Sequence, residues 1–151
     1  MKLTTILLYS YKYFVRTLFL YIPSAIVVIS LYILAKQVVA GGIEFVLPWA
    51  EKAVIASATF AGIAFAISTA REGKLKMAYI QASEAFFRSC ISLVICIILL
   101  VSMQYLSLGT VLAWFAKIGT IFYGLGAGLF FAYGLVRLNF LFIDTKLPGL
   151  K

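Results

Sequence analysis

The chain has 151 residues, of which 64% are apolar and only 12% are charged, and its mean hydropathy is +1.09. Soluble domains are about half apolar and about a quarter charged. A water-soluble fold of this length could not bury so much apolar surface. The composition therefore excludes an ordinary soluble domain and predicts an integral membrane protein, for which the bilayer is the solvent.

The net charge is +8, from 13 Lys and Arg residues against five acids. In a soluble protein this excess would suggest nucleic-acid binding. Here the basic residues gather in the short segments between apolar stretches, where they orient membrane spans and contact anionic head groups. We therefore expect membrane lipids as partners at the cytoplasmic face and no nucleic acid.

Four uncharged stretches divide the chain, at 17–35, 53–70, 89–116 and 118–136. A helix that crosses the hydrocarbon core needs about 20 residues. The sequence therefore predicts an all-α membrane protein, a bundle of four transmembrane helices in one domain covering residues 1–151. The expected spans are approximately 17–37, 50–70, 85–106 and 112–137, with a turn around Ser107-Leu108-Gly109.

The distribution of basic residues predicts the orientation. With the N-terminus in the cytoplasm, ten Lys and Arg residues lie on that side, and only Lys36, Lys52 and Lys117 lie outside. Positive residues favour the cytoplasmic side, so we expect both termini there, and Trp49 and Trp114 at the outer boundary. The expected location is the inner membrane of a bacterium.

Small residues recur at every fourth position in two of the spans, a pattern that lets membrane helices approach closely. Two interpretations are open: these stripes pack within the four-helix bundle, which is the simpler one, or one of them is a subunit interface. The predicted helix-packing residues are Ala58, Gly62, Ala66 and Ala70 in the second span, and Gly124, Gly128 and Ala132 in the fourth.

Few side chains are suited to catalysis or metal binding. The chain has no histidine, its two cysteines are six positions apart in one apolar stretch, and its five acids are scattered. Metal sites, haem sites and nucleophile–base pairs depend on these residue types. We therefore expect no enzyme activity, no cofactor and no metal.

Four charged residues are candidates for contacts with a partner or for gating. Glu84 and Arg88 are four positions apart, with the acid first, which favours an intrahelical ion pair at the expected cytoplasmic start of the third span. Such a pair anchors a helix end, or alternatively docks a partner or gates a pathway. Glu44 and Glu51 are expected to be solvated on the outer side, and acids there would attract cations if a pore were present.

These observations predict a small membrane subunit that acts by helix–helix association in a homo-oligomer or with a larger membrane protein. One alternative is a homo-oligomeric ion channel or pore. Another is the small membrane subunit of a multi-component transporter. Trp49-Ala50-Glu51 and Arg71-Glu72-Gly73, on either side of the second span, are similar to the small four-helix subunit of tripartite periplasmic-binding-protein-dependent transporters.

Overall fold

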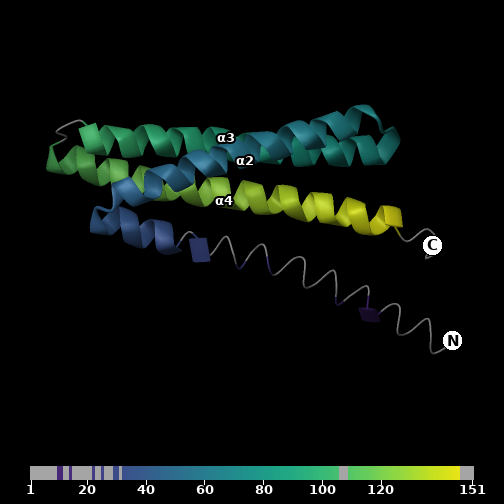
Figure 1. Ribbon diagram of the computed structural model, residues 1–151, viewed down its shortest axis with the longest axis horizontal. Coiled ribbons are helices and arrows are strands. Elements are labelled where there is room, and N and C mark those ends of the chain that lie inside the picture. The colour runs from purple at the N-terminus through teal and green to yellow at the C-terminus, as the bar shows by residue number, and fades with distance from the viewer. Residues whose placement is uncertain are drawn as a thin grey trace.

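A computed structural model describes residues 32–105 and 109–146, a few scattered positions between 10 and 30, and side chains as far as Leu138. Residues 32–40 form a helical segment, called here the leading segment. Three long helices follow: α2 (Ile43–Thr69), α3 (Gly73–Tyr105) and α4 (Thr110–Lys146) (Figure 1). No strand occurs among the described residues, so the all-α prediction is confirmed for them.

Each of the three long helices is long and apolar enough to cross a membrane. The chain is therefore an integral membrane protein by the length and composition of these helices. Most of the predicted first span, 17–37, lies outside the described residues, as do Ser107 and Leu108 of the predicted turn before α4.

The helix α3 begins at Gly73, well before the predicted start of the third span at 85. Charged residues in the sequence predict the ends of spans. However, Lys, Glu, Gln, Met and Ala are all good helix formers, so the charged residues between Gly73 and Arg88 do not end the helix. Gly73 itself has a φ of +61°, a left-handed conformation that favours glycine, and this angle lets the chain reverse between α2 and α3.

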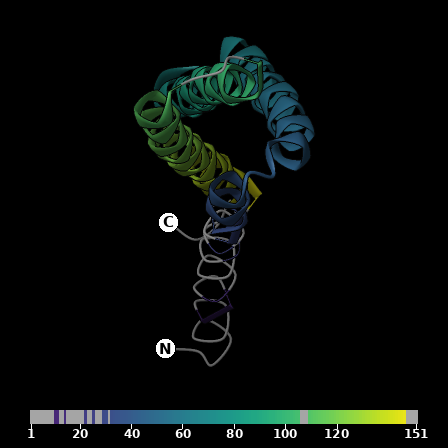
Figure 2. The same cartoon turned by 90° about the vertical axis from the view of Figure 1, so that its left-hand side faces the viewer.

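The helix α3 is the central element of the fold. It packs against both α2 and α4, whereas α2 and α4 do not pack extensively against each other. Viewed along the helices, α2 and α4 lie on either side of α3, and the leading segment lies opposite α3, between α2 and α4 (Figure 2). This arrangement leaves the space between α2 and α4 to be lined by side chains of all four helical pieces.

Two groups of buried residues hold the helices together. The first group joins the leading segment to α2 and α3 through Val38, Val46, Ala50, Cys96 and Leu100. The second group is centred on Phe86 and includes three small residues, Ala61, Ala64 and Ala82, where α2 and α3 approach closely. The ring of Phe86 lies 5.3 Å from the rings of both Phe60 and Phe131, measured between centroids.

Candidate functional site

A buried polar link joins the three long helices near the middle of their lengths. The hydroxyl oxygens of Ser57 and Ser89 are 3.3 Å apart, and Ser89 Oγ donates to the Ala127 carbonyl at 2.9 Å. Ser57 lies close to the midpoint of α2, and Ser89 lies at the midpoint of α3. Ala127 is likewise close to the midpoint of α4. This link sets the register of the three helices.

The stripe predicted on α2 lies on the exposed face of that helix. Ala58, Gly62, Ala66 and Ala70 are all exposed, and a Cβ added at Gly62 would meet nothing within 4 Å. Instead, α2 turns a different row of small residues toward α3, namely Ser57, Ala61, Ala64 and Ser68. Their spacing of four, three and four positions is the heptad pattern of close helix packing, which differs from a strict four-residue repeat.

The stripe predicted on α4 faces the inside of the protein. Gly124 and Ala132 are buried and Gly128 is half-buried. A Cβ added at Gly124 would collide with the side chain of Leu34, which belongs to the leading segment. The small size of Gly124 therefore allows the leading segment to approach α4 closely.

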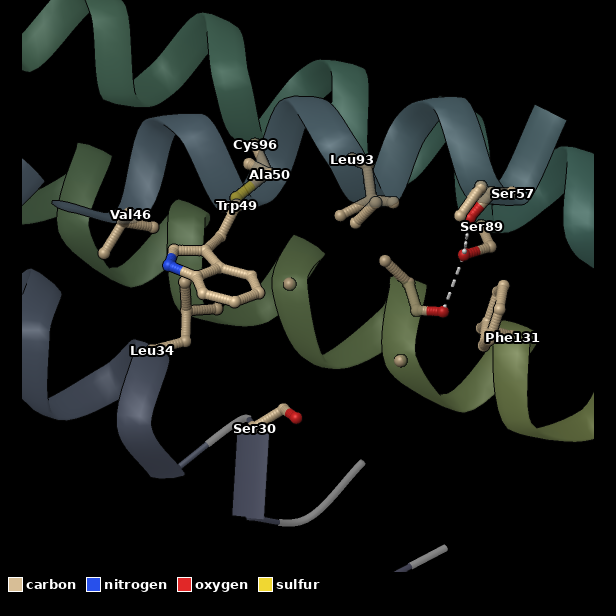
Figure 3. A pocket seen from close by; sticks show the side chains of 15 residues that line it. Ser30, Leu34, Val46, Trp49, Ala50, Ser57, Ser89, Leu93, Cys96 and Phe131 are labelled. Atoms are coloured by element: carbon tan, nitrogen blue, oxygen red, sulfur yellow. Dashed lines mark hydrogen bonds between the residues drawn. The ribbon is translucent and has the colours of Figure 1, made fainter. Parts of the chain in front are cut away.

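An apolar cavity of about 370 Å³ lies between α2, α3, α4 and the leading segment (Figure 3). Ser57, Ser89 and Phe131 lie at one end of it, and Leu34, Val46 and Trp49 lie toward the other. Much of its volume exists because its lining includes several alanines and glycines, which are Ala50, Ala53, Ala56, Ala127, Gly124 and Gly128.

The sequence patterns do not predict this cavity. Gly124 and Gly128 were singled out as packing residues, and both line the cavity. Ala53, Ala56 and Leu93 were not singled out. Ala50, Ala53 and Ala56 lie on one side of α2, and this cluster of small residues was the one sequence feature that could have indicated a cavity. Which helices they face, however, depends on the tertiary packing.

A groove that contains a charged pair lies on the outer surface between α3 and α4. It is lined by Gln81, Glu84, Ala85, Arg88, Leu129, Phe130 and Tyr133. Arg88 donates to the carboxylate of Glu84, as their spacing predicts, and its guanidinium lies 6.0 Å from the centre of the Phe130 ring. Both charged side chains are more than half exposed, at 58% for Arg88 and 55% for Glu84. The groove therefore brings a neutral ion pair to the surface of the protein.

The ion pair lies about three turns into α3. Glu84 and Arg88 lie several turns after the start of α3 at Gly73, well inside the helix rather than at its beginning. The Ser83 hydroxyl donates to the Ala61 carbonyl at 2.9 Å, so Glu84 is level with the centre of the uncharged stretch 53–70 of α2. Phe130, next to Arg88, belongs to the uncharged stretch 118–136 of α4.

The other two candidate charges lie near the beginning of α2. Glu44 is in its first turn and Glu51 follows about two turns later, and both are exposed. They are far along α2 from Ala61, which marks the level of the Glu84–Arg88 pair, so the structure does not bring the four candidate charges together. Among the described residues, no group of three or more His, Cys, Asp or Glu side chains is placed to hold a metal ion.

No family model, curated protein or solved structure matches this chain.

Proposed function

We propose that this chain is a small integral membrane subunit that acts by helix–helix association within a homo-oligomeric or hetero-oligomeric membrane complex. The observation that carries the proposal is the position of the Glu84–Arg88 pair. It is more than half exposed on the outside of the bundle, and it is level with uncharged stretches of both neighbouring helices.

The cost of placing charges in hydrocarbon supports this proposal. Ionisable side chains within membrane helices face the interior of a bundle, a water-filled cavity or a partner. Glu84 and Arg88 partly neutralise each other, but more than half of each side chain is left exposed by the described part of the chain. A partner helix with polar groups would supply the remaining hydrogen bonds and exclude lipid from the pair.

The exposed small-residue stripe of α2 is a second feature that suits an interface. Small residues allow close approach of two helix backbones in lipid, where packing drives association. Ala58, Gly62, Ala66 and Ala70 are not covered by the described part of this chain. A second helix could therefore pack along α2 without displacing large side chains.

The proposal includes a topology and a location. The chain would form four spans with both termini in the cytoplasm, in the inner membrane of a bacterium. In this orientation the turn between α2 and α3 is cytoplasmic, and Arg71 in the turn contacts anionic head groups together with Lys74 and Lys76 at the start of α3.

Site-specific photocrosslinking in native membranes tests the association. A benzoylphenylalanine in place of Gln81, which lines the groove beside Glu84, is expected to crosslink one discrete protein. The same label in place of Ile98, which is exposed on α3 nearer its other end, is the matched control for lipid contact. Lipid adducts alone at both positions would overturn the proposal.

The identity of the crosslinked protein separates the remaining possibilities. A product of two differently tagged copies of this chain would establish a homo-oligomer. A larger membrane protein would favour the transporter-subunit alternative or another hetero-complex. The channel alternative gains no support from the cavity, because a conducting pathway needs polar groups that replace ion hydration, and this lining is mostly apolar.

A further inference from the structure

The apolar cavity is large enough to hold a ligand. Protein interiors are close-packed, with few voids larger than a water molecule. An engineered apolar cavity of about 150 Å³ in a soluble protein binds benzene or xenon, and ligand pockets begin at roughly 300 Å³. At about 370 Å³, this cavity is in the range of ligand sites.

The chemistry of the lining favours hydrocarbon over water. A buried water needs two to four polar partners. Three serines line the cavity, Ser30, Ser57 and Ser89. The hydroxyls of Ser57 and Ser89 already contact each other, and Ser89 also donates to the Ala127 carbonyl. Within the described part of the chain, every buried side-chain nitrogen or oxygen has a hydrogen-bond partner. An apolar occupant therefore fits this lining better than a cluster of water molecules.

The length and position of the cavity match one leaflet of a bilayer. Along α2 the lining runs from Val46 to Ser57, a length of about 16 Å at the helical rise. This is roughly half of a hydrocarbon core that is about 30 Å thick. The Ser57–Ser89 link at the inner end lies at the middle of α2 and α3, as described above. The space therefore has the depth of one acyl chain that enters from a single leaflet.

A cation flanks the cavity next to Trp49, about midway between Val46 and Ser57 along α2. The indole of Trp49 lines the cavity, and the Lys52 ammonium is 5.4 Å from the centre of that ring. Side chains three positions apart share a face of a helix, and the long stem of Lys52 lets its ammonium extend past Trp49 toward a head group at the outer surface. Glu51 is rotated about 100° from Lys52 around the helix and points elsewhere. The charge beside the cavity is therefore complementary to an anionic head group.

From these observations we infer that the cavity is a specific site for one acyl chain of an anionic membrane lipid, whose head group pairs with Lys52. The site goes beyond the proposed association, because the Glu84–Arg88 groove lies on the outer surface between α3 and α4. The small residues at Ala53 and Ala56 leave room for the chain, and Trp49 and Lys52 select its anionic end.

Quenching of Trp49 fluorescence by brominated lipid tests the site in bilayers. A Trp114→Phe background leaves Trp49 as the single tryptophan. Brominated phosphatidylglycerol is compared with brominated phosphatidylcholine of the same acyl composition. We expect a preference of roughly fivefold for the anionic lipid, the factor for one lysine near a head group. Equal quenching by the two lipids would overturn the inference.

Two further variants assign the effect to the cavity. Ala53→Leu fills the space and is expected to abolish the preference, whereas Ala70→Leu, an exposed position at the other end of α2, is expected to retain it. Lys52→Gln leaves the cavity open and is expected to bind both lipids equally. If Ala53→Leu behaved like Ala70→Leu, the chain would not enter the cavity. If Ala53→Leu failed to fold, Lys52→Gln would provide the test, because a retained preference for the anionic lipid in that variant would overturn the inference.

Discussion

Gly134 and Phe86 are in such close contact that a Cβ atom on Gly134 would stand 2.8 Å from the Phe86 ring. The ring is fully buried and is held between Phe60 and Phe131, so it has little freedom to move away. The absence of a side chain at Gly134 therefore allows α4 to approach α3. This contact lies in the aromatic core that joins all three long helices.

Gly134→Ala is expected to destabilise the fold by about 1–2 kcal/mol, because overpacking outweighs the helix propensity gained from alanine. Gly126→Ala in the same helix is the matched control, since a Cβ there meets nothing within 4 Å, and we expect it to be neutral or stabilising by up to about 1 kcal/mol. Unfolding in mixed detergent micelles measures both. Equal effects of the two variants would contradict the contact with Phe86.

Ser89→Ala is expected to lower the free energy of unfolding by about 1 kcal/mol, the typical size of an interhelical hydrogen bond in a membrane protein. The change removes the contact with Ser57 and the hydrogen bond to the Ala127 carbonyl. Ser102→Ala is the control, because the Ser102 hydroxyl donates to the Ile98 carbonyl within its own helix. A loss of the same size in both variants would mean that the link between helices contributes nothing.

The sequence was sufficient to predict an integral membrane protein with helical secondary structure. Both features follow from the composition and from uncharged stretches that are long enough to span a membrane. The relative positions of the helices were not predictable in this way. Charges in the sequence predict the boundaries of spans, but the register set by Ser57, Ser89 and Ala127 brings Glu84 and Arg88 level with uncharged parts of α2 and α4. Such a register depends on side-chain packing between helices.

The faces of the helices were also only partly predictable. The strict repeat of Ala58, Gly62, Ala66 and Ala70 was the more regular pattern on α2, yet the row from Ser57 to Ser68 contacts α3. Both rows contain small residues, so composition did not distinguish them. The cavity was missed for a similar reason, because Ala53, Leu93 and Gly128 come from three helices and meet only in the folded protein.

The two rows on α2 predict opposite outcomes for neighbouring substitutions. Ala61→Leu is expected to disrupt the fold, because Ala61 is buried where α2 approaches α3. Gly62→Leu is expected to leave the folded chain intact and to weaken association, because it adds bulk to the exposed stripe. Protease resistance reports the fold, and native mass spectrometry reports the assembly. A Gly62→Leu protein of unchanged assembled mass would remove this stripe from the interface.

The topology predicts labelling from opposite sides of the membrane at the two ends of α3. In a background of Cys90→Ser and Cys96→Ala, a cysteine replaces either Glu72 or Gly109, which are exposed next to these ends. We expect a membrane-impermeant maleimide to label Glu72→Cys only from the cytoplasm and Gly109→Cys only from outside. The reverse pattern would invert the orientation, and labelling from one side alone would mean that α3 does not span the bilayer.

Removal of both charges from the outer groove is expected to separate folding from assembly. In Glu84→Leu/Arg88→Leu, no unpaired charge remains, so the isolated chain should fold as well as before, because apolar residues replace an ion pair at a half-exposed site. A polar partner surface would then face leucine and lose its hydrogen bonds, so we expect the amount of copurified partner to fall at least tenfold. Glu84→Arg/Arg88→Glu keeps both charges and the i, i+4 pairing and serves as the control, with partial association expected. If the double leucine variant assembled normally, lipid would cover the groove, and the association proposed for this face would be wrong.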